Sequence, residues 1–380
     1  MVIVGFGTRP EAIKLAPVVR ELRRSGRFRV VTVHTGQHDE LADQVLRIFR
    51  LPVHHAFKIM TAHQSVGEVL ARTIHHADQL FRRRRPDAVL VQGDTASAFG
   101  LGVAASLHRV LVGHVEAGLR SYDRQAPFPE EVMRILLSQA ADLHFAPSEH
   151  ARANLLREGV PRERIFVTGN TVVDALKDVT RRMPLPDVRA LWPVGAVRIL
   201  LTMHRRESFG SPMLEALRTV RRLAEEDPRV AVVFPVHPNP AVRRAVARTL
   251  ESHDRIRLCP PVDYLTLIAL LRSATLVLSD SGGIQEEAPS FRVPVLVLRK
   301  VTERPEGLAP DGNVLVGTSG PAIRAAFRRL LAKRPNRALS SPQPSAFGDG
   351  RAAARITRIL SAALCGTRLV SSGLQFRYRR

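Results

Sequence analysis

The chain has 380 residues, of which 45% are hydrophobic, and this length fits two domains that are each large enough for a core of their own. No run of 18 apolar residues occurs, so we expect no membrane span, and the opening MVIVGFGTRP has no basic and apolar regions of a secretion signal. The two cysteines, Cys259 and Cys365, lie far apart without the spacing of metal ligands, which favours a reducing cytoplasm and no structural zinc.

The net charge of +22 raises the question of a nucleic-acid partner. Only five of the 57 basic residues are Lys, and the Arg residues are spread along the predicted helices. Aromatic residues make up 5% of the chain, too few to suggest base-stacking platforms. We therefore expect no nucleic-acid partner, although a positive field would favour an anionic substrate.

In the first half of the chain, short apolar runs alternate with amphipathic segments, a pattern typical of parallel α/β sheets. Helices are predicted near residues 10–24, 39–50 and 64–83, with Pro17 expected to bend the first one. Strands are predicted at 2–7, 29–35, 56–60, 88–93, 110–116, 143–147 and 165–169.

The second half repeats this alternation after a proline-rich loop at 183–194. We therefore predict two domains of similar architecture, at residues 1–171 and 172–350. The tail at 365–380 has weak periodicity and is expected to be loose. Strands of the second half are predicted at 198–204, 230–237, 256–260, 275–280 and 294–299.

Polar residues follow several of these strands, at the place where open α/β sheets bind ligands. Glu116 ends an apolar strand that has no structural need for a carboxylate, and Asp94 ends another, where it also suits a helix N-cap. His204 ends the first strand of the second half beside two Arg residues, which suggests a nearby anion. Glu130 and Glu131 open a helix after Pro129, and one of the two is expected only to complement the helix dipole.

Two glycine-containing turns are candidate anion sites. The run Gly5 to Pro10 contains Arg9 at a helix start, but it lacks the third glycine of a dinucleotide fingerprint. The run Asp280 to Gly283 precedes a helix that carries Glu286 and Glu287, and one of these acids is placed to accept hydrogen bonds from a diol such as a ribose. Arg304 is a further candidate for anion binding.

At these residues the sequence resembles the non-hydrolysing UDP-N-acetylglucosamine 2-epimerases over roughly residues 2–363. One of the shared motifs alone would be weak evidence, but their ordered set is specific. The motifs are FGTRPEAIKLAPVV, TGQH, VQGDT, GHVEAGLRS, PFPEE, GNTVVDAL, HRRESFG, PVHPNP, SDSGGIQEEAPS, TERPEG and GDGRA.

The resemblance implies two Rossmann-like domains with a cleft between them, of the glycosyltransferase-B type, and a C-terminal helix at 351–364 that packs back on the first domain. It implies reversible conversion of UDP-N-acetylglucosamine to UDP-N-acetylmannosamine in the cytoplasm by a homodimer. A base removes the C2 proton, UDP leaves C1, and UDP adds back to the bound 2-acetamidoglucal after reprotonation on the other face. No metal or cofactor is implied.

The resemblance also assigns roles to individual residues, although it leaves open which carboxylate is the base. Some bacterial members bind a second UDP-N-acetylglucosamine as an activator beside the substrate. The implied catalytic residues are Asp94, Glu116, Glu130 and His204. The implied substrate contacts are Arg9, Lys14, Val262, Leu267, Ser281, Gly282, Gly283, Glu287 and Arg304. The positions that match the activator site are Gln37, His38, Gln64, Arg205 and His237.

Several residues depart from the family pattern. His63 replaces an Arg beside the activator positions, Met133 an Asn on the catalytic helix, and Leu267 an aromatic residue beside the uracil. Met203 replaces a small residue before His204. Two alternatives therefore stay open: a hydrolysing relative that releases N-acetylmannosamine and UDP, and an inactive protein that binds sugar nucleotides or nucleic acid.

Overall fold

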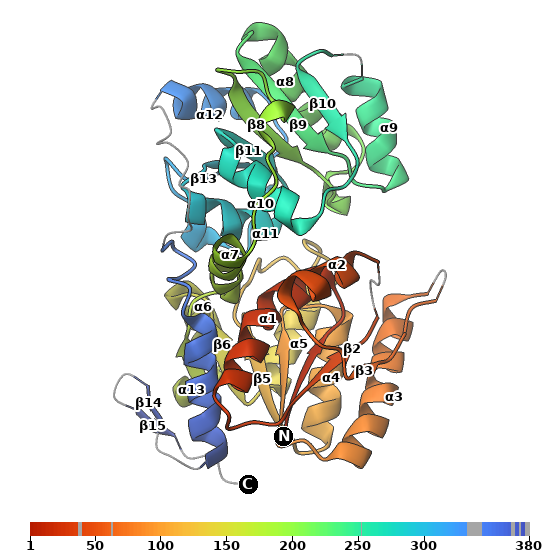
Figure 1. Cartoon of the computed structure of the whole chain (residues 1–380), viewed down its shortest axis with the longest axis vertical. Coiled ribbons are helices and arrows are strands. Elements are labelled where there is room, and N and C mark those ends of the chain that lie inside the picture. The colour runs from red at the N-terminus through yellow and green to blue at the C-terminus, as the bar shows by residue number, and fades with distance from the viewer. Residues whose placement is uncertain are drawn as a thin grey trace. The chain divides into compact units, whose positions relative to one another are not determined.

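A computed structural model of the chain describes residues 1–36, 40–61, 64–251, 253–332, 344–365, 369–371 and 374–376. The described chain forms two compact units (Figure 1). Unit 1 comprises 1–179 and 347–380, and unit 2 comprises 180–346. Each unit is built around one parallel sheet with helices on both faces.

Unit 1 contains a seven-stranded sheet in the order β3-β2-β1-β4-β5-β6-β7, with every neighbouring pair parallel. Its strands are β1 (Val2–Phe6), β2 (Val30–His34), β3 (His55–Ala56), β4 (Ala88–Gln92), β5 (Leu111–Val115), β6 (Leu143–Ala146) and β7 (Ile165–Val167). Its helices are α1 (Arg9–Arg24), α2 (Glu40–Phe49), α3 (Val66–Arg84), α4 (Ala96–Leu107), α5 (Glu130–Ala140), α6 (Glu149–Arg157), α7 (Thr171–Arg182) and α13 (Ala352–Cys365).

Unit 2 contains a six-stranded parallel sheet in the order β10-β9-β8-β11-β12-β13. Its strands are β8 (Val197–Thr202), β9 (Val230–Pro235), β10 (Ile256–Cys259), β11 (Leu276–Ser279), β12 (Val295–Val297) and β13 (Asn313–Leu315). Its helices are α8 (Ser211–Glu226), α9 (Pro240–Thr249), α10 (Tyr264–Ser273), α11 (Gly282–Glu287) and α12 (Gly320–Ala332).

The cores follow from the alternation of strand side chains between the two faces of a sheet. In unit 1, Ile3, Val89 and Val112 share one apolar cluster with residues of α3 and α4. In unit 2, Ile199, Val232 and Leu278 pack in a cluster with residues of α8, α9 and α12. Because both faces of each sheet are covered, the strands read as continuous apolar runs, and this is why they were predictable.

Two predictions about the strands need correction. The strand expected at 56–60 is only His55–Ala56, because its neighbour β2 ends at His34 and the backbone leaves the extended region at Lys58, where φ is +51°. The edge strand β13 was not predicted, since three residues give no periodic signal. The described part of the tail, which we expect to be loose, contains the short antiparallel strands β14 (Leu369–Ser371) and β15 (Leu374–Phe376).

The helix α13 is joined to unit 1 by polar contacts at both of its ends. Asp174 on α7 accepts hydrogen bonds from the backbone amides of Ala352 and Ala353 at 3.0–3.1 Å and so satisfies the start of α13. Arg27 donates to the hydroxyl of Ser361 at 2.8 Å near the other end. Residues 171–179 of α7 and the chain from Phe347 onward belong to unit 1, whereas the sequence placed its boundaries at 171 and 350.

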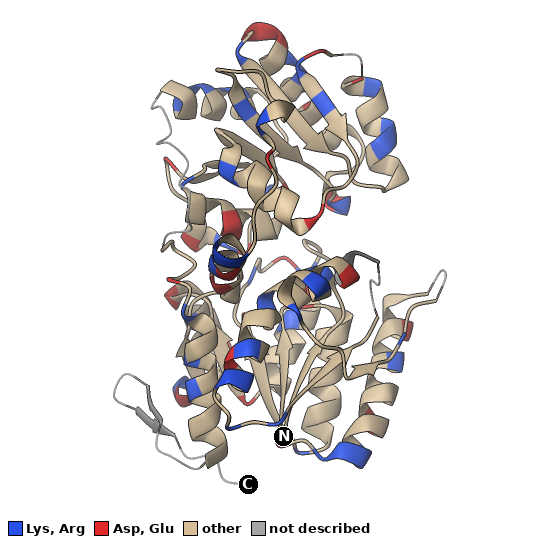
Figure 2. Ribbon diagram, viewed as in Figure 1, with Lys and Arg blue, Asp and Glu red and all other residues tan. Residues whose placement is uncertain are grey.

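Charged side chains are distributed over both units. Lys and Arg occur on helices throughout the described chain, as Figure 2 shows, in keeping with an Arg-rich surface. Among the described residues, no helix has the length and apolar character that crossing a membrane requires.

Gly118, in the turn after β5, tests how tightly this turn is packed. Its φ is +91°, and a Cβ there would lie 2.2 Å from the carbonyl oxygen of Ala151. We expect Gly118→Ala to lower the free energy of unfolding by about 1–3 kcal/mol through backbone strain, with a further loss from this clash. Urea-induced unfolding followed by circular dichroism measures the change.

Gly159 provides the matched control, because its φ is +81° and a Cβ there would meet nothing within 4 Å. Gly159→Ala should cost only the backbone strain, about 1–3 kcal/mol. Equal losses in the two variants would contradict the close packing of the turn at Gly118.

Candidate active site

The turns after β1, β4 and β5 carry three of the candidate residues of unit 1. These strands belong to one parallel sheet, so their carboxyl ends lie at the same edge. Arg9 follows β1, Asp94 follows β4 and Glu116 follows β5. The strand-end rule that selected these residues from the sequence therefore places them along one edge of one sheet.

Glu116 is the first residue beyond β5 and has a φ of +67°, which is unusual for a residue with a side chain. Its side chain is only 5% exposed. The Nζ of Lys14 donates to its Oε2 at 2.5 Å, and the Nδ2 of Asn170 donates to the same oxygen at 2.9 Å. A buried carboxylate is stable only with such partners.

Asp94 follows Gly93 in the turn after β4, and its side chain is 27% exposed. It forms an ion pair with Arg134 of α5, with Nη2 and Oδ2 separated by 2.5 Å. The turn itself is fixed by His114, whose Nε2 donates to the carbonyl oxygen of Gly93 at 2.8 Å. Burial lowers the pKa of His114 to about 4, so the ring is neutral at pH 7 and acts as a structural donor.

The two acids at the start of α5 have different environments. Glu131 is fully buried and accepts hydrogen bonds from the backbone amides of Ser121 and Tyr122 at 3.0–3.1 Å. Arg134 lies 3.2 Å from it as well. Glu130 is only half-buried. Glu131 is therefore the structural member of the pair, which leaves Glu130 as the candidate for chemistry.

Met133, which departs from the family pattern, is buried on the same helix. It packs in a small apolar cluster with Ile59, Val69 and Ala96. The substitution thus exchanges a polar group for apolar packing between α3, α4 and α5, and it leaves the contacts of Asp94 and Glu131 in place.

The turn at Ser281 in unit 2 joins β11 to α11, and Ser281 is the N-cap of that short helix. A Cβ at Gly282 would lie 2.7 Å from Nη1 of Arg304, so only glycine lets this guanidinium pack against the start of α11. Arg304 donates through Nε to Glu286 at 2.5 Å and through Nη1 to Glu303 at 3.1 Å. The structure therefore brings Ser281, Gly282 and Arg304 together, as an anion site requires.

Glu287 is buried one turn further along α11, and its Oε1 accepts a hydrogen bond from the hydroxyl of Tyr264 at 3.2 Å. Because Glu286 holds Arg304, the two acids of this helix again have separate roles. Val262 and Leu267, the candidates for uracil contact, are half-buried on either side of Tyr264 at the start of α10.

His204 lies in the turn after β8, between the turns that follow β9 and β11. Asp280 accepts hydrogen bonds from the backbone amides of His204 and Arg205, both at 2.9 Å, and lies 3.3 Å from Nδ1 of the ring. The ring of His237 stacks on that of His204 at 5.6 Å. Packing around the ring lowers the pKa of His204 more than Asp280 raises it, although 36% of the side chain is exposed.

The positions that match the family's activator site are only partly described. Gln37 and His38, and the departing residue His63, lie outside the described residues. Gln64 is in unit 1, where its Oε1 accepts from the amide and hydroxyl of Thr61 at 2.8 Å. Arg205 and His237 are in unit 2, where both adjoin His204.

The sequence assigned no individual role to several residues of these networks. Asn170 holds Glu116, Asp280 orders the turn at His204, and Glu11 accepts a hydrogen bond from Thr95, the neighbour of Asp94. Asn170 and Asp280 come at or soon after the ends of β7 and β11, so the strand-end rule could have found them. Glu11, in the first turn of a helix, carried no such signal.

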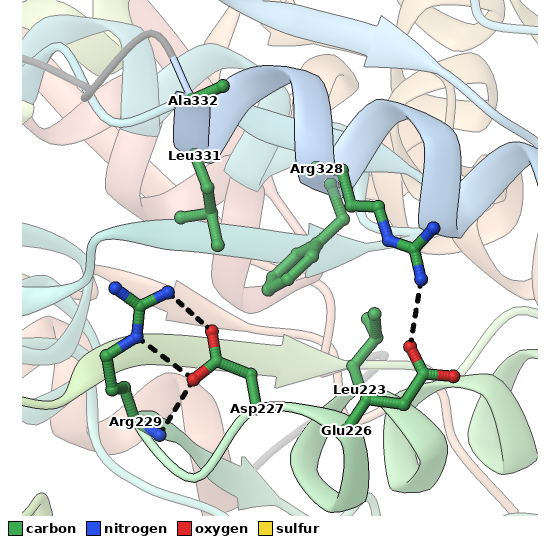
Figure 3. A pocket seen from close by; sticks show the side chains of 8 residues that line it. Leu223, Glu226, Asp227, Arg229, Arg328, Leu331 and Ala332 are labelled. Carbon is green, nitrogen blue, oxygen red and sulfur yellow. Dashed lines mark hydrogen bonds and ion pairs between the residues drawn. The ribbon is translucent and has the colours of Figure 1, made fainter.

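A pocket of about 450 Å³ on unit 2 is separate from these residues (Figure 3). It lies before β9, at the amino end of the strands, and its charged groups are paired as Arg229 with Asp227 and Arg328 with Glu226. None of the predicted site residues lines it. Among the described residues, no group of three His, Cys, Asp or Glu side chains is arranged to hold a metal.

A family model described as UDP-N-acetylglucosamine 2-epimerase matches residues 20–361 of the chain. The chain belongs to this family. The UDP-N-acetylglucosamine 2-epimerase of Yersinia pestis is 44% identical over 367 residues, which cover 94% of this chain and 98% of that protein. The prediction of an isomerase of this family, with a two-domain α/β fold of the glycosyltransferase-B type, is confirmed.

Solved structures of the epimerase family share this fold. The UDP-GlcNAc 2-epimerase of Neisseria meningitidis, bound to UDP-GlcNAc, is 37% identical with a TM-score of 0.87, covering 95% of this chain and 99% of that one. The enzyme of Methanocaldococcus jannaschii, in complex with UDP-GlcNAc and UDP, is 33% identical with a TM-score of 0.81 and the same coverage.

A substitution of His144 tests whether the buried histidines of strands β5 and β6 are uncharged in the folded protein. It pairs with His114 across β5 and β6, and burial lowers its pKa to about 3. The unfolded chain therefore binds one more proton below pH 6.5, and His144 makes the protein less stable as the pH falls from 6.5 towards 3. His144→Gln should make the slope of unfolding free energy between pH 6 and 4 shallower by about 1.4 kcal/mol per pH unit.

Urea unfolding at a series of pH values measures this slope. The exposed His150 is the control, and His150→Gln should leave the slope unchanged. A wild-type slope in His144→Gln would mean that His144 is protonated in the folded protein.

Proposed function

We propose that this enzyme interconverts UDP-N-acetylglucosamine and UDP-N-acetylmannosamine without hydrolysis. The observation that carries the proposal is the set of carboxylates at one edge of the unit 1 sheet, with Glu116 held by Lys14 and Asp94 held by Arg134. Removal of the weakly acidic C2 proton needs a carboxylate base, and return of a proton to the opposite face needs a second donor. The relatives solved with UDP-GlcNAc support this substrate.

The proposed reaction has two reversible steps. A carboxylate takes the C2 proton while the C1–O bond breaks and both of its electrons leave with UDP, which produces 2-acetamidoglucal. A proton then enters C2 from the other face and UDP adds back to C1. Asp94, Glu116 and Glu130 are the groups that would exchange these protons, and their fixed partners would reduce reorganisation during the reaction.

In this proposal unit 2 binds the nucleotide. The amides at Ser281, Gly282 and Gly283 and the guanidinium of Arg304 would stabilise the departing diphosphate. Glu287 would accept hydrogen bonds from the ribose, and Val262 and Leu267 would contact the uracil. Arg9 would bind the substrate from unit 1, and the neutral ring of His204 would supply a hydrogen bond rather than a charge.

We further propose that the enzyme works in the cytoplasm as a homodimer. Any activation by a second substrate molecule would involve Gln37, His38, Gln64, Arg205 and His237. The free cysteines Cys259 and Cys365 suit a reducing compartment. Light scattering coupled to size exclusion tests the dimer, and a sigmoidal dependence of rate on substrate concentration tests the activation.

Incubation with UDP-N-acetylglucosamine in deuterated buffer tests the reaction. We expect a proton NMR time course to show UDP-N-acetylmannosamine and loss of the C2 proton signal in both sugars, because the abstracted proton exchanges with solvent. Traces of UDP and 2-acetamidoglucal should accompany them. Epimerisation without solvent label would exclude the mechanism, and steady release of free N-acetylmannosamine would identify the hydrolysing alternative.

Glu116→Gln tests the role of the most deeply buried candidate acid. Removal of a proton-transfer group should lower kcat by about 10²–10⁴-fold, with a smaller effect on KM. The exposed Glu149 provides the matched control, and Glu149→Gln should retain wild-type kinetics. Wild-type kcat in Glu116→Gln would remove Glu116 from the mechanism.

A further inference from the structure

Glu11, the third residue of α1, is a buried acid that the proposed mechanism does not use. Its side chain accepts hydrogen bonds from three donors. Oε2 accepts from the backbone amide of Gly7 at 3.0 Å and from the hydroxyl of Thr8 at 2.7 Å. Oε1 accepts from the hydroxyl of Thr95 at 2.8 Å. Among the residues that the structure describes, no basic side chain forms an ion pair with Glu11.

These donors belong to two different turns of unit 1. Gly7 and Thr8 lie between β1 and α1 and directly precede Arg9. Thr95 directly follows Asp94 and is the N-cap of α4, where its Oγ1 accepts from the amide of Ala98 at 3.0 Å. Since a hydroxyl has one proton, the proton of Thr95 is committed to Glu11. The carboxylate thus connects the turn of Arg9 with the turn of Asp94.

A carboxylate is well suited to this place, because it offers two acceptor oxygens and no donor. Glutamine has only one acceptor oxygen, and with this oxygen on the amide of Gly7 its NH₂ group would face Thr95. The arrangement is costly for the protein, since burial without a cation raises the pKa of Glu11 to about 7 despite the hydrogen bonds. If the position served only packing, an apolar residue would destabilise the folded protein less than Glu11 does.

We propose that Glu11 is a positioning residue for the epimerisation, which fixes the Arg9 turn to the Asp94 turn through one carboxylate. Arg9 is a candidate contact of the substrate and Asp94 a candidate proton-transfer group, so a shift between their turns would misplace one relative to the other. Small misplacements of reacting groups cost rate more than binding. The inference rests on the proposed function, because it assigns Glu11 a part in that same reaction.

The test compares Glu11→Gln and Thr95→Val, separately and together, in the deuterium-exchange assay. Both changes remove the hydrogen bond that the hydroxyl of Thr95 donates to the carboxylate of Glu11, so we expect each to lower kcat by about 10–100-fold with a smaller change in KM. The double variant should be no slower than the slower single variant, because the shared contact is lost only once. Thr95→Ser keeps the hydroxyl and should restore nearly wild-type kcat.

Asp142→Asn is the matched control. Asp142 is also a carboxyl whose pKa is raised by burial, and it accepts from the amide of Val112 at 2.9 Å, but it lies at the amino end of the strands. The Asp142→Asn variant should be less stable than the wild-type protein and should keep the wild-type kcat. Unchanged kcat in Glu11→Gln and Thr95→Val, or multiplicative losses in the double variant, would overturn the inference.

If Glu11→Gln does not fold, Thr95→Val against Thr95→Ser still decides the inference: equal kcat in these two variants overturns it. Failure of the wild-type protein to exchange the C2 proton would count against the proposed function, and it is distinguishable because it appears before any variant is compared.

Discussion

The buried contact between Glu116 and Lys14 is the interaction on which the unit 1 site depends. A carboxylate with little exposure would otherwise be destabilised by the loss of water, and the chain just beyond β5 is already held at a positive φ. Lys14 comes from α1, and Asn170 precedes α7. Three segments that are distant in sequence are thus drawn to one oxygen, which fixes the edge of the sheet where the chemistry is proposed.

Other charged residues of the candidate site are likewise held by a partner of opposite charge or by backbone amides. Arg134 joins Asp94 to Glu131, Asp280 is satisfied by the backbone of His204 and Arg205, and Arg304 lies between two glutamates. Groups fixed in this way need little rearrangement when a charge develops on a substrate. The cost appears as buried polar groups that contribute little to stability, which is typical of sites kept for function.

Much of the fold and part of the site could be predicted from the sequence, for a definite physical reason. Strands covered on both faces are continuously apolar, and a polar residue at the end of such a strand, such as Asp94, Glu116 or His204, is conspicuous. The partners of these residues were not predictable in this way. Glu11 contacts Thr95 across 84 positions and His204 contacts Asp280 across 76, and such pairings depend on the order of strands in the sheet. The edge strands β3 and β13 were not predicted correctly, because they are too short to show the alternation of a strand.

The paired acids in the two units show how one local sequence can serve both folding and chemistry. Successive residues of an α-helix point about 100° apart, so neighbouring glutamates cannot share an environment. In α5 the second acid, Glu131, anchors the preceding turn, and its neighbour Glu130 stays half-exposed. In α11 the first acid, Glu286, holds Arg304, and its neighbour Glu287 points to Tyr264. In each pair one acid, Glu131 or Glu286, fixes the helix, and the adjacent acid is the candidate for function. Loss of the fixing acid would therefore displace the candidate acid. In α5 the helix dipole alone would not require this division, since it acts on both acids of the first turn, and in α11 the two acids lie at the end of the helix, where the dipole does not favour them.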